Sequence, residues 1–345
     1  MEAERGSLQI GTMVVAGALL LRLFSGGVLD MITQTLMKPE VTSFLFYLET
    51  GRVIRPVTPQ TIPEPVPEEI PGVTEMPTQP QEVLSSEVTA PAEFSSGDAD
   101  TVDIRNYCGY EADVRQLLEQ PLTWNLKQDV PTVLIVHSHG SESYEKTEDY
   151  EESSAYRTLD KGYNMVSIGQ RVAEMLEAAG IRVIHDTTLH DYPSYNGAYD
   201  NSREAIQSCL SQNPEICLVL DLHRDAAETA DGGQFSSTVD TPKGRSAQLM
   251  LVVGSDAGGL SHPNWEENLS LGVKLNAQLE KNVPGICRSI SFRSQRFNQD
   301  LSPGGMLVEV GAAGNTRQEA LLAAEYLAET IIQLAGGATT VDSTS

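Results

Sequence analysis

Basic residues are scarce in this chain. Its 345 residues include 23 lysines and arginines against 48 aspartates and glutamates, which gives a formal net charge of −25. A protein that binds nucleic acid through its phosphates needs a basic face, so this composition argues against a nucleic-acid partner. It also argues against electrostatic association with anionic lipid headgroups.

Cysteine is also scarce. The four cysteines, Cys108, Cys209, Cys217 and Cys287, show no CxxC pair and no spacing typical of metal ligands. Cys209 and Cys217 could meet where a predicted helix leads into a strand, and two buried thiols explain the pair equally well. The cysteines therefore indicate neither a metal site nor a redox compartment.

Long apolar runs are lacking except near the N-terminus. Gly6–Leu21 is mostly apolar, and it reaches the lower limit for a membrane span when Arg22 snorkels and the next two residues are included. We expect residues 1–52 to form an uncleaved membrane anchor region, with its span at about residues 7–24. A cleaved signal peptide is the alternative, because Ser25 and two glycines follow the run.

Proline is concentrated in one segment. Nine of the 18 prolines lie between Pro56 and Pro91, mixed with glutamate, threonine, glutamine and serine. Such a segment buries too little apolar surface to offset its ordering entropy. We therefore predict a disordered linker over residues 53–100 and a short disordered tail over residues 337–345.

Apolar runs and helical periodicity alternate between residues 101 and 336. Continuous apolar strands between helices are typical of a mostly parallel sheet covered on both faces. We predict an α/β fold with a single domain over this range. The expected strands are Val133–Val136, Ile181–Ile184, Ile216–Leu222, Leu249–Val253 and Met306–Val310, and the expected helices are Met165–Ala179, Ser202–Leu210, Asn264–Leu279 and Arg317–Leu334.

Three of these strands end in polar residues. The first is followed by His139 and Glu142, the third by His223, and the strand Met306–Val310 contains Glu309. The carboxyl ends of parallel strands lie along one edge of a sheet, so residues distant in sequence can converge there.

A catalytic zinc site needs three protein ligands and one open position, and two histidines with a carboxylate are a standard set. His139, Glu142 and His223 would supply it. His137 lies two residues before His139, so we expect its side chain on the same face, one step deeper, where a supporting group and a ligand are both open and support is favoured. The alternative for each histidine is a partly buried residue with satisfied hydrogen bonds.

Glu309 is unusual because carboxylates are rarely buried unless they are paired. Next to a metal-activated water it would serve as general base and then as general acid. The alternative is an ion pair with Arg203, Arg224 or Arg293.

The loop from His190 to Asn201 is rich in tyrosine, asparagine, aspartate and glycine, a composition often found in loops that line binding clefts. Tyr195, Asn196, Arg203 and Arg224 are our candidate substrate-binding residues. Serines also stand beside the first histidines, but the chain has no GxSxG elbow there, so a serine hydrolase is a weak alternative.

These motifs resemble the stage II sporulation protein P family of endospore-forming bacteria. The resemblance runs from Thr132 to Ala335, through VLIVHSHGSESY, KGYNMVSIGQRVAEMLEAAGIRVIHD, HDYPSYNGAYDNSREAI, ICLVLDLHRDA and FNQDLSPGGMLVEVGAAGNT. It implies a zinc-dependent peptidoglycan hydrolase related to the N-acetylmuramoyl-L-alanine amidases. Such an enzyme cuts the amide between muramic acid and the stem peptide, and also peptide cross-links. It acts with the stage II sporulation proteins D and M during engulfment of the forespore.

The resemblance also implies roles for single residues. His139 and His223 look like zinc ligands, with His223 part of the catalytic centre, and Glu309 looks like the catalytic glutamate. Related amidases take their glutamate ligand from just before the first long helix, where this chain has Asp160, Lys161 and Gly162. Glu142 is therefore our candidate for the third ligand.

A substrate outside the cytoplasm implies a single-pass protein of the cell membrane, with its N-terminus inside and its catalytic domain in the intermembrane space around the forespore. Two other functions stay open at this stage. One is a catalytically weak module that binds peptidoglycan, and the other is a metal-dependent deacetylase, which would release acetate.

Overall fold

The computed structural model describes residues 94–336, apart from 96, 123, 147–149, 151–155 and 230–231. The predicted anchor region, most of the predicted linker and the predicted tail lie outside the described residues. Within the described part, no helix is both long and apolar enough to cross a membrane.

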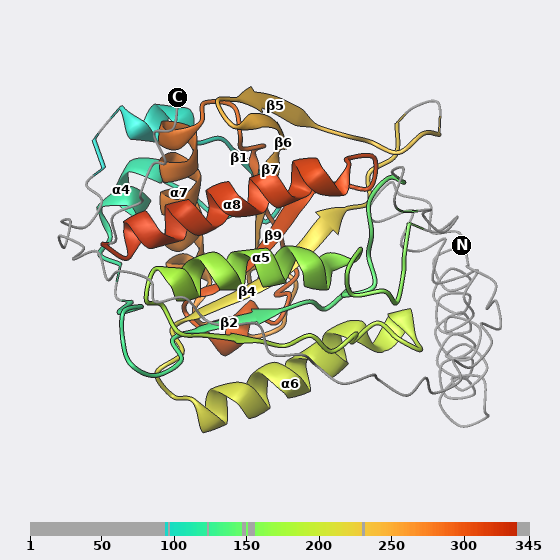
Figure 1. The fold of residues 1–345 in the computed structure, drawn as a ribbon. Helices are drawn as coiled ribbons and strands as arrows, with labels where there is room; N and C mark the ends of the chain where they lie inside the picture. Colours follow the sequence, from blue (N-terminus) through green and yellow to red (C-terminus); the bar gives the residue numbers. More distant parts are fainter. Residues whose placement is uncertain are drawn as a thin grey trace, which may run out of the picture. The chain divides into compact units, whose positions relative to one another are not determined.

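A seven-stranded sheet forms the centre of the fold, with strand order β1-β8-β7-β9-β4-β2-β3 (Figure 1). A two-stranded antiparallel hairpin, β5-β6, accompanies it. The strands are β1 (Ile104–Asn106), β2 (Val133–Val136), β3 (Val183–His185), β4 (Leu218–Asp225), β5 (Thr238–Thr241), β6 (Gly244–Ala247), β7 (Leu249–Val253), β8 (Ile290–Phe292) and β9 (Gly305–Ala312).

The sheet is parallel except at one pairing. β9, β4, β2 and β3 run in one direction, and β7 pairs antiparallel with β9. The predicted mostly parallel sheet is confirmed. The antiparallel step was not predicted, because an apolar run does not reveal the direction in which a strand enters the sheet.

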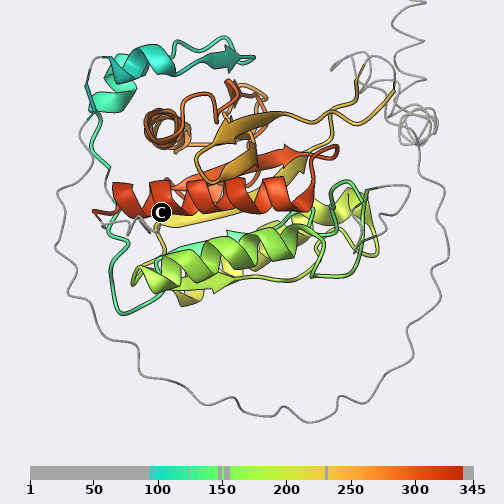
Figure 2. The ribbon, with the colours of Figure 1, turned by 45° about the horizontal axis from the view of Figure 1, so that its top comes forward.

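Helices cover both faces of the sheet, as predicted. Odd-numbered residues of β2, such as Val133, share a buried cluster with α5, α7 and α8, whereas its even-numbered residues, such as Leu134, pack with α6. Figures 1 and 2 show α5 and α8 side by side over the sheet. The helices are α4 (Val114–Glu119), α5 (Met165–Ala178), α6 (Ala198–Gln212), α7 (Trp265–Asn282) and α8 (Arg317–Leu334), with short 3-10 turns η1 (Asp98–Thr101), η2 (Tyr195–Gly197) and η3 (Gln299–Leu301).

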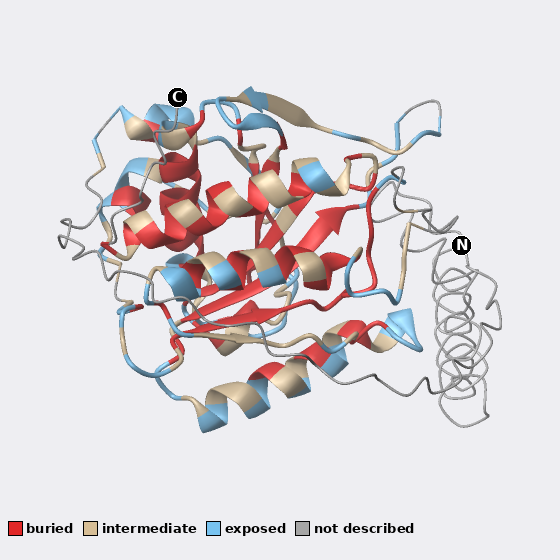
Figure 3. Cartoon of the chain, viewed as in Figure 1, coloured by how far each residue is buried: buried red, intermediate tan, exposed pale blue. Residues whose placement is uncertain are grey.

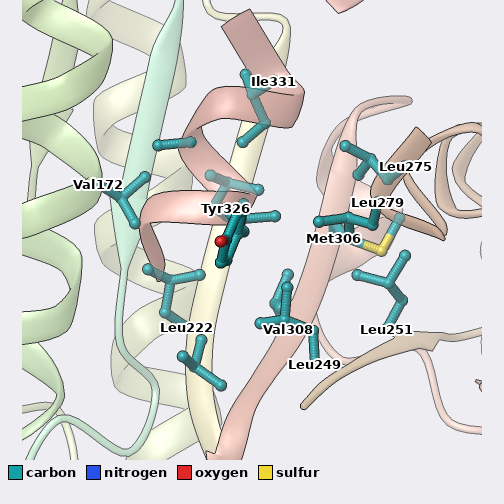
Figure 4. Close-up of a cluster of buried hydrophobic side chains, with 14 of the residues drawn as sticks. Val172, Leu222, Leu249, Leu251, Leu275, Leu279, Met306, Val308, Tyr326 and Ile331 are labelled. Carbon is teal, nitrogen blue, oxygen red and sulfur yellow. The ribbon is translucent and has the colours of Figure 1, made fainter. Parts of the chain in front are cut away.

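The main core lies between the sheet and the layer of α5, α7 and α8, where buried residues follow the strands (Figure 3). In the close-up, Val172, Leu222, Val308 and Tyr326 come from α5, β4, β9 and α8, which are separate in sequence (Figure 4). Burying one leucine or valine side chain contributes roughly 1.5–3 kcal/mol. This core therefore stabilises the strands β4 and β9, which carry His223 and Glu309.

Local sequence signals set the helix ends near the site. The Asn164 side chain accepts a hydrogen bond from the Val166 amide and caps the start of α5, and Gly180 follows its end with φ +79°. At α8, Thr316 and Glu319 form a reciprocal capping box.

The predicted elements all occur, with small shifts at some ends. β2, β7 and α8 have the predicted bounds, while α6 begins four residues before the predicted Ser202. The edge strand β1, its neighbour β8 and the β5-β6 hairpin were not predicted. The four cysteines are free thiols, so Cys209 and Cys217 form no disulfide.

Candidate active site at the carboxyl ends of β2, β4 and β9

The sheet places the polar strand ends next to one another. β4 lies between β2 and β9, parallel to both, with Asp221 opposite Val136 and His223 opposite Glu309. The chain that leaves β2 carries His139 and Glu142 to the same edge. The structure thus brings together the four residues for which the sequence predicts metal binding or catalysis.

His139, Glu142 and His223 are buried side chains in mutual proximity. The ring centroids of His139 and His223 are 5.4 Å apart, and the Glu142 Oε2 atom lies 3.9 Å from the His223 Nδ1 atom. In the described residues, no three His, Cys, Asp or Glu side chains already stand in a metal-coordinating arrangement. Their chemistry is nevertheless that of a catalytic zinc site, two imidazoles and a carboxylate.

Buried polar atoms without partners support that fit. Among the described residues, the Nδ1 atom of His139 and the Oε2 atom of Glu309 are buried and have no hydrogen-bond partner. A native structure rarely leaves such groups unsatisfied, and an ion bound at the site is one recognised reason. The residues present therefore fit a bound zinc ion.

Asp221 lies behind His223. Its Oδ1 atom is 2.8 Å from the His223 Nε2 atom, but off the direction of the N–H bond, so the two form a close ion pair without a hydrogen bond. The Ser138 amide donates to the same carboxylate at 2.8 Å, and the Ser138 hydroxyl donates to it at 2.6 Å. With its hydroxyl committed to Asp221, Ser138 is not placed as a nucleophile beside a histidine base, which disfavours the serine-hydrolase alternative.

Burial and charge shift the pKa values of the histidines in opposite directions. Burial lowers the pKa of His139 to about 4. Burial also acts to lower the pKa of His223, but the neighbouring carboxylates, Asp221 first and then Glu142 and Glu309, together outweigh burial and raise that pKa to about 9.

The two glutamates differ in the same way. Burial raises the pKa of Glu309 to about 8, the largest effect on that group. Burial also acts to raise the pKa of Glu142, but the positive charge of Arg224, followed by His223 and His139, lowers it overall. The edge of the sheet thus holds one carboxylate that favours its ionised form and one that favours its protonated form, the division that acid–base chemistry uses.

None of the three arginines considered as partners of Glu309 pairs with it. Arg203 forms a two-bond ion pair with Asp300, and Arg293 lies over the Tyr107 ring. The Arg224 side chain donates to two backbone carbonyl oxygens and lies 3.9 Å from Glu142. The buried Glu309 is therefore not explained by an arginine pair.

His137 does not share a face with His139, and that prediction is wrong. Its ring lies against Gly169 of α5, its Nε2 atom is 2.9 Å from the Nε2 atom of His185, and its Nδ1 atom is 3.1 Å from the Leu222 carbonyl oxygen. His139 instead stacks on Tyr195, next to the start of α6. The alternation of side chains stops because β2 ends at Val136.

Of the candidate substrate-binding residues, Tyr195 lies at the site. It is 51% exposed, its ring stacks on His139 at 4.3 Å between centroids, and the Arg157 guanidinium lies 4.4 Å from its centroid. Asn196 is exposed in the same short turn, η2. Arg203 and Arg224 are engaged in the contacts described above, with Asp300 and with backbone carbonyls.

Several site residues received no role from the sequence. Arg157 pairs with Asp191 at 2.9 Å and reaches Glu142 at 3.4 Å, and the Tyr199 ring lies 5.4 Å from that of His139. Arg157 comes from a segment without periodicity, so no signal pointed to it. Asp191 and Tyr199 belong to the loop and helix start whose polar composition had suggested a cleft.

The family comparison decides the relationship. The family described as Stage II sporulation protein P (SpoIIP) matches residues 63–332, most of the chain. The chain belongs to the stage II sporulation protein P family. The family resemblance expected from the motifs is therefore confirmed.

A curated relative and three solved structures are similar to this chain. Stage II sporulation protein P of Bacillus subtilis (strain 168) is 27% identical over 229 residues, which cover 63% of this chain and 54% of the relative, so the match spans about half the relative's length. The N-acetylmuramoyl-L-alanine amidase AmiC2 of Nostoc punctiforme superposes with a TM-score of 0.35 at 16% identity, over 58% of this chain and 94% of that chain. The amidase from Clostridium difficile 630 gives 0.35 at 12% identity over 59% and 96%, and Ami1 from Mycobacterium smegmatis gives 0.36 at 12% over 60% and 98%.

Proposed function

We propose that this chain is a zinc-dependent peptidoglycan hydrolase of sporulation. It would cleave the N-acetylmuramoyl-L-alanine amide and peptide cross-links. The observation that carries the proposal is the cluster of buried His139, Glu142 and His223 next to Glu309, whose buried oxygen has no partner. Membership of the stage II sporulation protein P family supports the same substrate class.

His139, Glu142 and His223 would hold the metal. When bound, zinc polarises the scissile carbonyl and lowers the pKa of water toward neutrality. Asp221 holds the His223 ring from behind, anchored by the Ser138 amide and hydroxyl. A carboxylate behind a ligand histidine is the usual device for orienting the imidazole.

Glu309 would handle the protons. It lies beside His223 in register, so its carboxylate can accept a proton from the attacking water and then deliver that proton to the leaving amine. Burial raises the pKa of Glu309 to about 8 in the metal-free chain, which makes the protonated form accessible near neutral pH. A group that must serve first as base and then as acid works best with its pKa near the working pH.

The proposed location follows from the substrate. Residues 1–52 would anchor the chain in the cell membrane, with the N-terminus inside and the catalytic domain in the intermembrane space around the forespore. Peptidoglycan and the stage II sporulation proteins D and M would be its partners. Protease treatment of protoplasts from non-sporulating cells that express the chain, before and after permeabilisation, would check this orientation, because digestion of the domain only after permeabilisation would contradict it.

The activity is tested by mass spectrometry of the products. Full-length chain loaded with zinc is incubated with intact peptidoglycan and with peptidoglycan already cut by a glycan-cleaving enzyme. An amidase releases free stem peptides, an endopeptidase releases separated cross-linked peptides, and a deacetylase releases acetate. Release of acetate alone, or binding without any soluble product, would overturn the proposal.

Variants place the activity at the site. Glu309→Gln and His223→Ala should strongly reduce product release, and the wild-type chain should carry stoichiometric zinc. Glu325→Gln is the matched control, since it makes the same exchange in a half-buried glutamate of α8 that pairs with Arg171 of α5. Unchanged digestion by Glu309→Gln would contradict the assignment of the general base.

A further inference from the structure

Two consecutive residues near the site have an unusual backbone. Phe297 and Asn298 have φ values of +50° and +59°, in the left-handed region that favours glycine. Asparagine tolerates this conformation, but for a bulky aromatic residue it is an outlier. Such strained positions persist only where the surroundings enforce them, and they cluster at ligand-binding sites. The segment is FNQD, part of a motif to which the proposed chemistry gives no role.

Side-chain hydrogen bonds enforce this conformation. The Asn298 amide donates to the Tyr199 carbonyl oxygen at 2.8 Å and to the Ser202 hydroxyl at 3.2 Å. The Arg203 guanidinium donates to the Asn298 side-chain oxygen at 3.3 Å and pairs with Asp300 through two bonds of 2.9 and 2.7 Å. The loop is thereby bound to the first turns of α6.

The same bonds connect the loop to the candidate metal site. The Ser202 hydroxyl, which accepts from Asn298, lies 2.7 Å from the Ser138 hydroxyl, and Ser138 donates to Asp221. Asp221 is the carboxylate behind His223. An unbroken chain of short contacts therefore runs from the strained loop to a proposed zinc ligand.

The Phe297 ring lies next to the Tyr199 ring. The two ring centroids are 6.0 Å apart, and the Tyr199 ring in turn lies 5.4 Å from His139 and 6.3 Å from His223. Phe297 is partly exposed, and within the described residues it belongs to neither buried apolar cluster. A large apolar side chain held in a strained conformation without joining the core is therefore not explained by packing.

We propose that Phe297 and Tyr199 form an aromatic subsite that binds an apolar group of the substrate directly beside the scissile amide, and that Asn298 and Arg203 are positioning residues for it. The proposal rests on the proposed function. Two parts of a peptidoglycan substrate share the required chemistry: the C–H face of the sugar, and the methyl groups of the lactyl and alanyl units. An aromatic ring offers a flat apolar surface to either.

The test separates substrate binding from chemistry. Full-length chain carrying Glu309→Gln is used for binding to peptidoglycan by co-sedimentation, and the active chain is used for kinetics. Phe297→Ala should weaken binding and raise KM by about tenfold, the effect of one lost hydrophobic contact, with kcat little changed. Phe297→Leu, which keeps apolar bulk and is the safer variant for folding, should lose less. Tyr107→Ala is the matched control, because Tyr107 is an exposed aromatic residue that directly follows the edge strand β1, away from the site.

Soluble substrates identify the bound group. A muramoyl-peptide whose affinity falls with Phe297→Ala, while that of the free peptide does not, points to the muramoyl unit with its sugar face and lactyl methyl, and an equal fall for both points to the alanyl methyl group. Asn298→Gly keeps the backbone conformation but removes the bracing amide, and it should raise KM without changing zinc affinity. If the Phe297 variants bind and digest like wild type, the subsite is wrong while the proposed function stands. If the wild-type chain digests nothing, the proposed function fails first.

Discussion

Glu309 lies directly beside His223, each at the same level of two adjacent parallel strands, β9 and β4. Burial raises the pKa of Glu309 to about 8. Burial acts to lower the pKa of His223, but the carboxylates around it, Asp221 first and then Glu142 and Glu309, together raise that pKa to about 9. The pair therefore combines a carboxyl group that favours its protonated form with an imidazole whose positive charge is stabilised by the Asp221 carboxylate. The sheet register alone sets this arrangement, without any loop in between.

Glu309→Gln should lower peptidoglycan hydrolysis by a factor of about 10² to 10⁴, the usual contribution of a positioned general base. The amide keeps the shape of the side chain but cannot accept the proton of water. Zinc content should stay at the wild-type level, because Glu309 is not one of the proposed ligands. Product release is measured together with zinc by elemental analysis, and a variant that loses zinc along with activity would identify Glu309 as a ligand instead.

Asp221→Asn should weaken zinc binding by about 10- to 100-fold, the typical effect of removing a carboxylate behind a ligand histidine. The asparagine oxygen can still accept from the Ser138 amide, so the fold should survive. The readout is zinc affinity in competition with a chelator, which does not depend on turnover. Asp200→Asn, on the exposed side of α6, serves as the control. Wild-type zinc affinity for Asp221→Asn would show that the carboxylate does not orient His223.

Much of the fold is predictable from apolar patterns. β2 and β7 form where the sequence indicates because each is a continuous apolar run buried in the core, and α8 does so because it is a long helix rich in alanine and leucine. β1 and β8 have three residues each, too few to show a period. Their place in the sheet depends on tertiary contacts that no local pattern records.

The candidate site divides in the same way. His223 and Glu309 are predictable because strand ends of a parallel sheet share an edge. The face of His137 is not, because the alternation that would place it ends with β2 at Val136. Arg157 comes from a loop, and its approach to Tyr195 and Glu142 results from the path of the chain and not from any spacing in the sequence.

Lys274 should make the stability of the chain depend on pH at alkaline values. Its ammonium group is buried, donates to the Leu117 carbonyl and the Ser270 hydroxyl, and has a pKa that burial lowers from 10.5 to about 8. The folded chain therefore binds this proton less tightly than the unfolded chain. Stability should fall as the pH drops from 10.5 to about 8, by at most about 1.4 kcal/mol per pH unit, and the loss should stay constant below that.

Lys274→Met removes this dependence. The difference in unfolding free energy between variant and wild type should move in favour of the variant as the pH falls through that window, as measured by urea denaturation at each pH. Lys281→Met, at the exposed end of the same helix, is the control for general effects of alkaline pH. A parallel pH dependence of wild type and Lys274→Met would show that the lysine is not desolvated in the folded chain.

Gly169→Ala should destabilise the fold, against the ordinary rule for helices. Replacing glycine by alanine inside a helix usually stabilises it by about 1 kcal/mol. Here an added Cβ atom would lie 2.5 Å from the His137 Nε2 atom and 2.7 Å from the His185 Nε2 atom. His137 is fully buried and held by the Leu222 carbonyl, so its ring cannot withdraw. The overpacking should cost about 1–3 kcal/mol.

Gly272→Ala in α7 is the matched control for this substitution. Its added Cβ would meet the Val253 Cγ2 atom at 3.1 Å and the flexible end of Met306 at 3.4 Å, so a smaller shift of its neighbours would suffice. Thermal and urea unfolding of both variants should therefore give the larger loss for Gly169→Ala. Because His137 follows β2 directly and precedes His139 by two residues, displacing its ring should also lower zinc affinity, which Gly272→Ala should leave unchanged. A Gly169→Ala chain as stable as wild type would mean that α5 does not press on the two histidines.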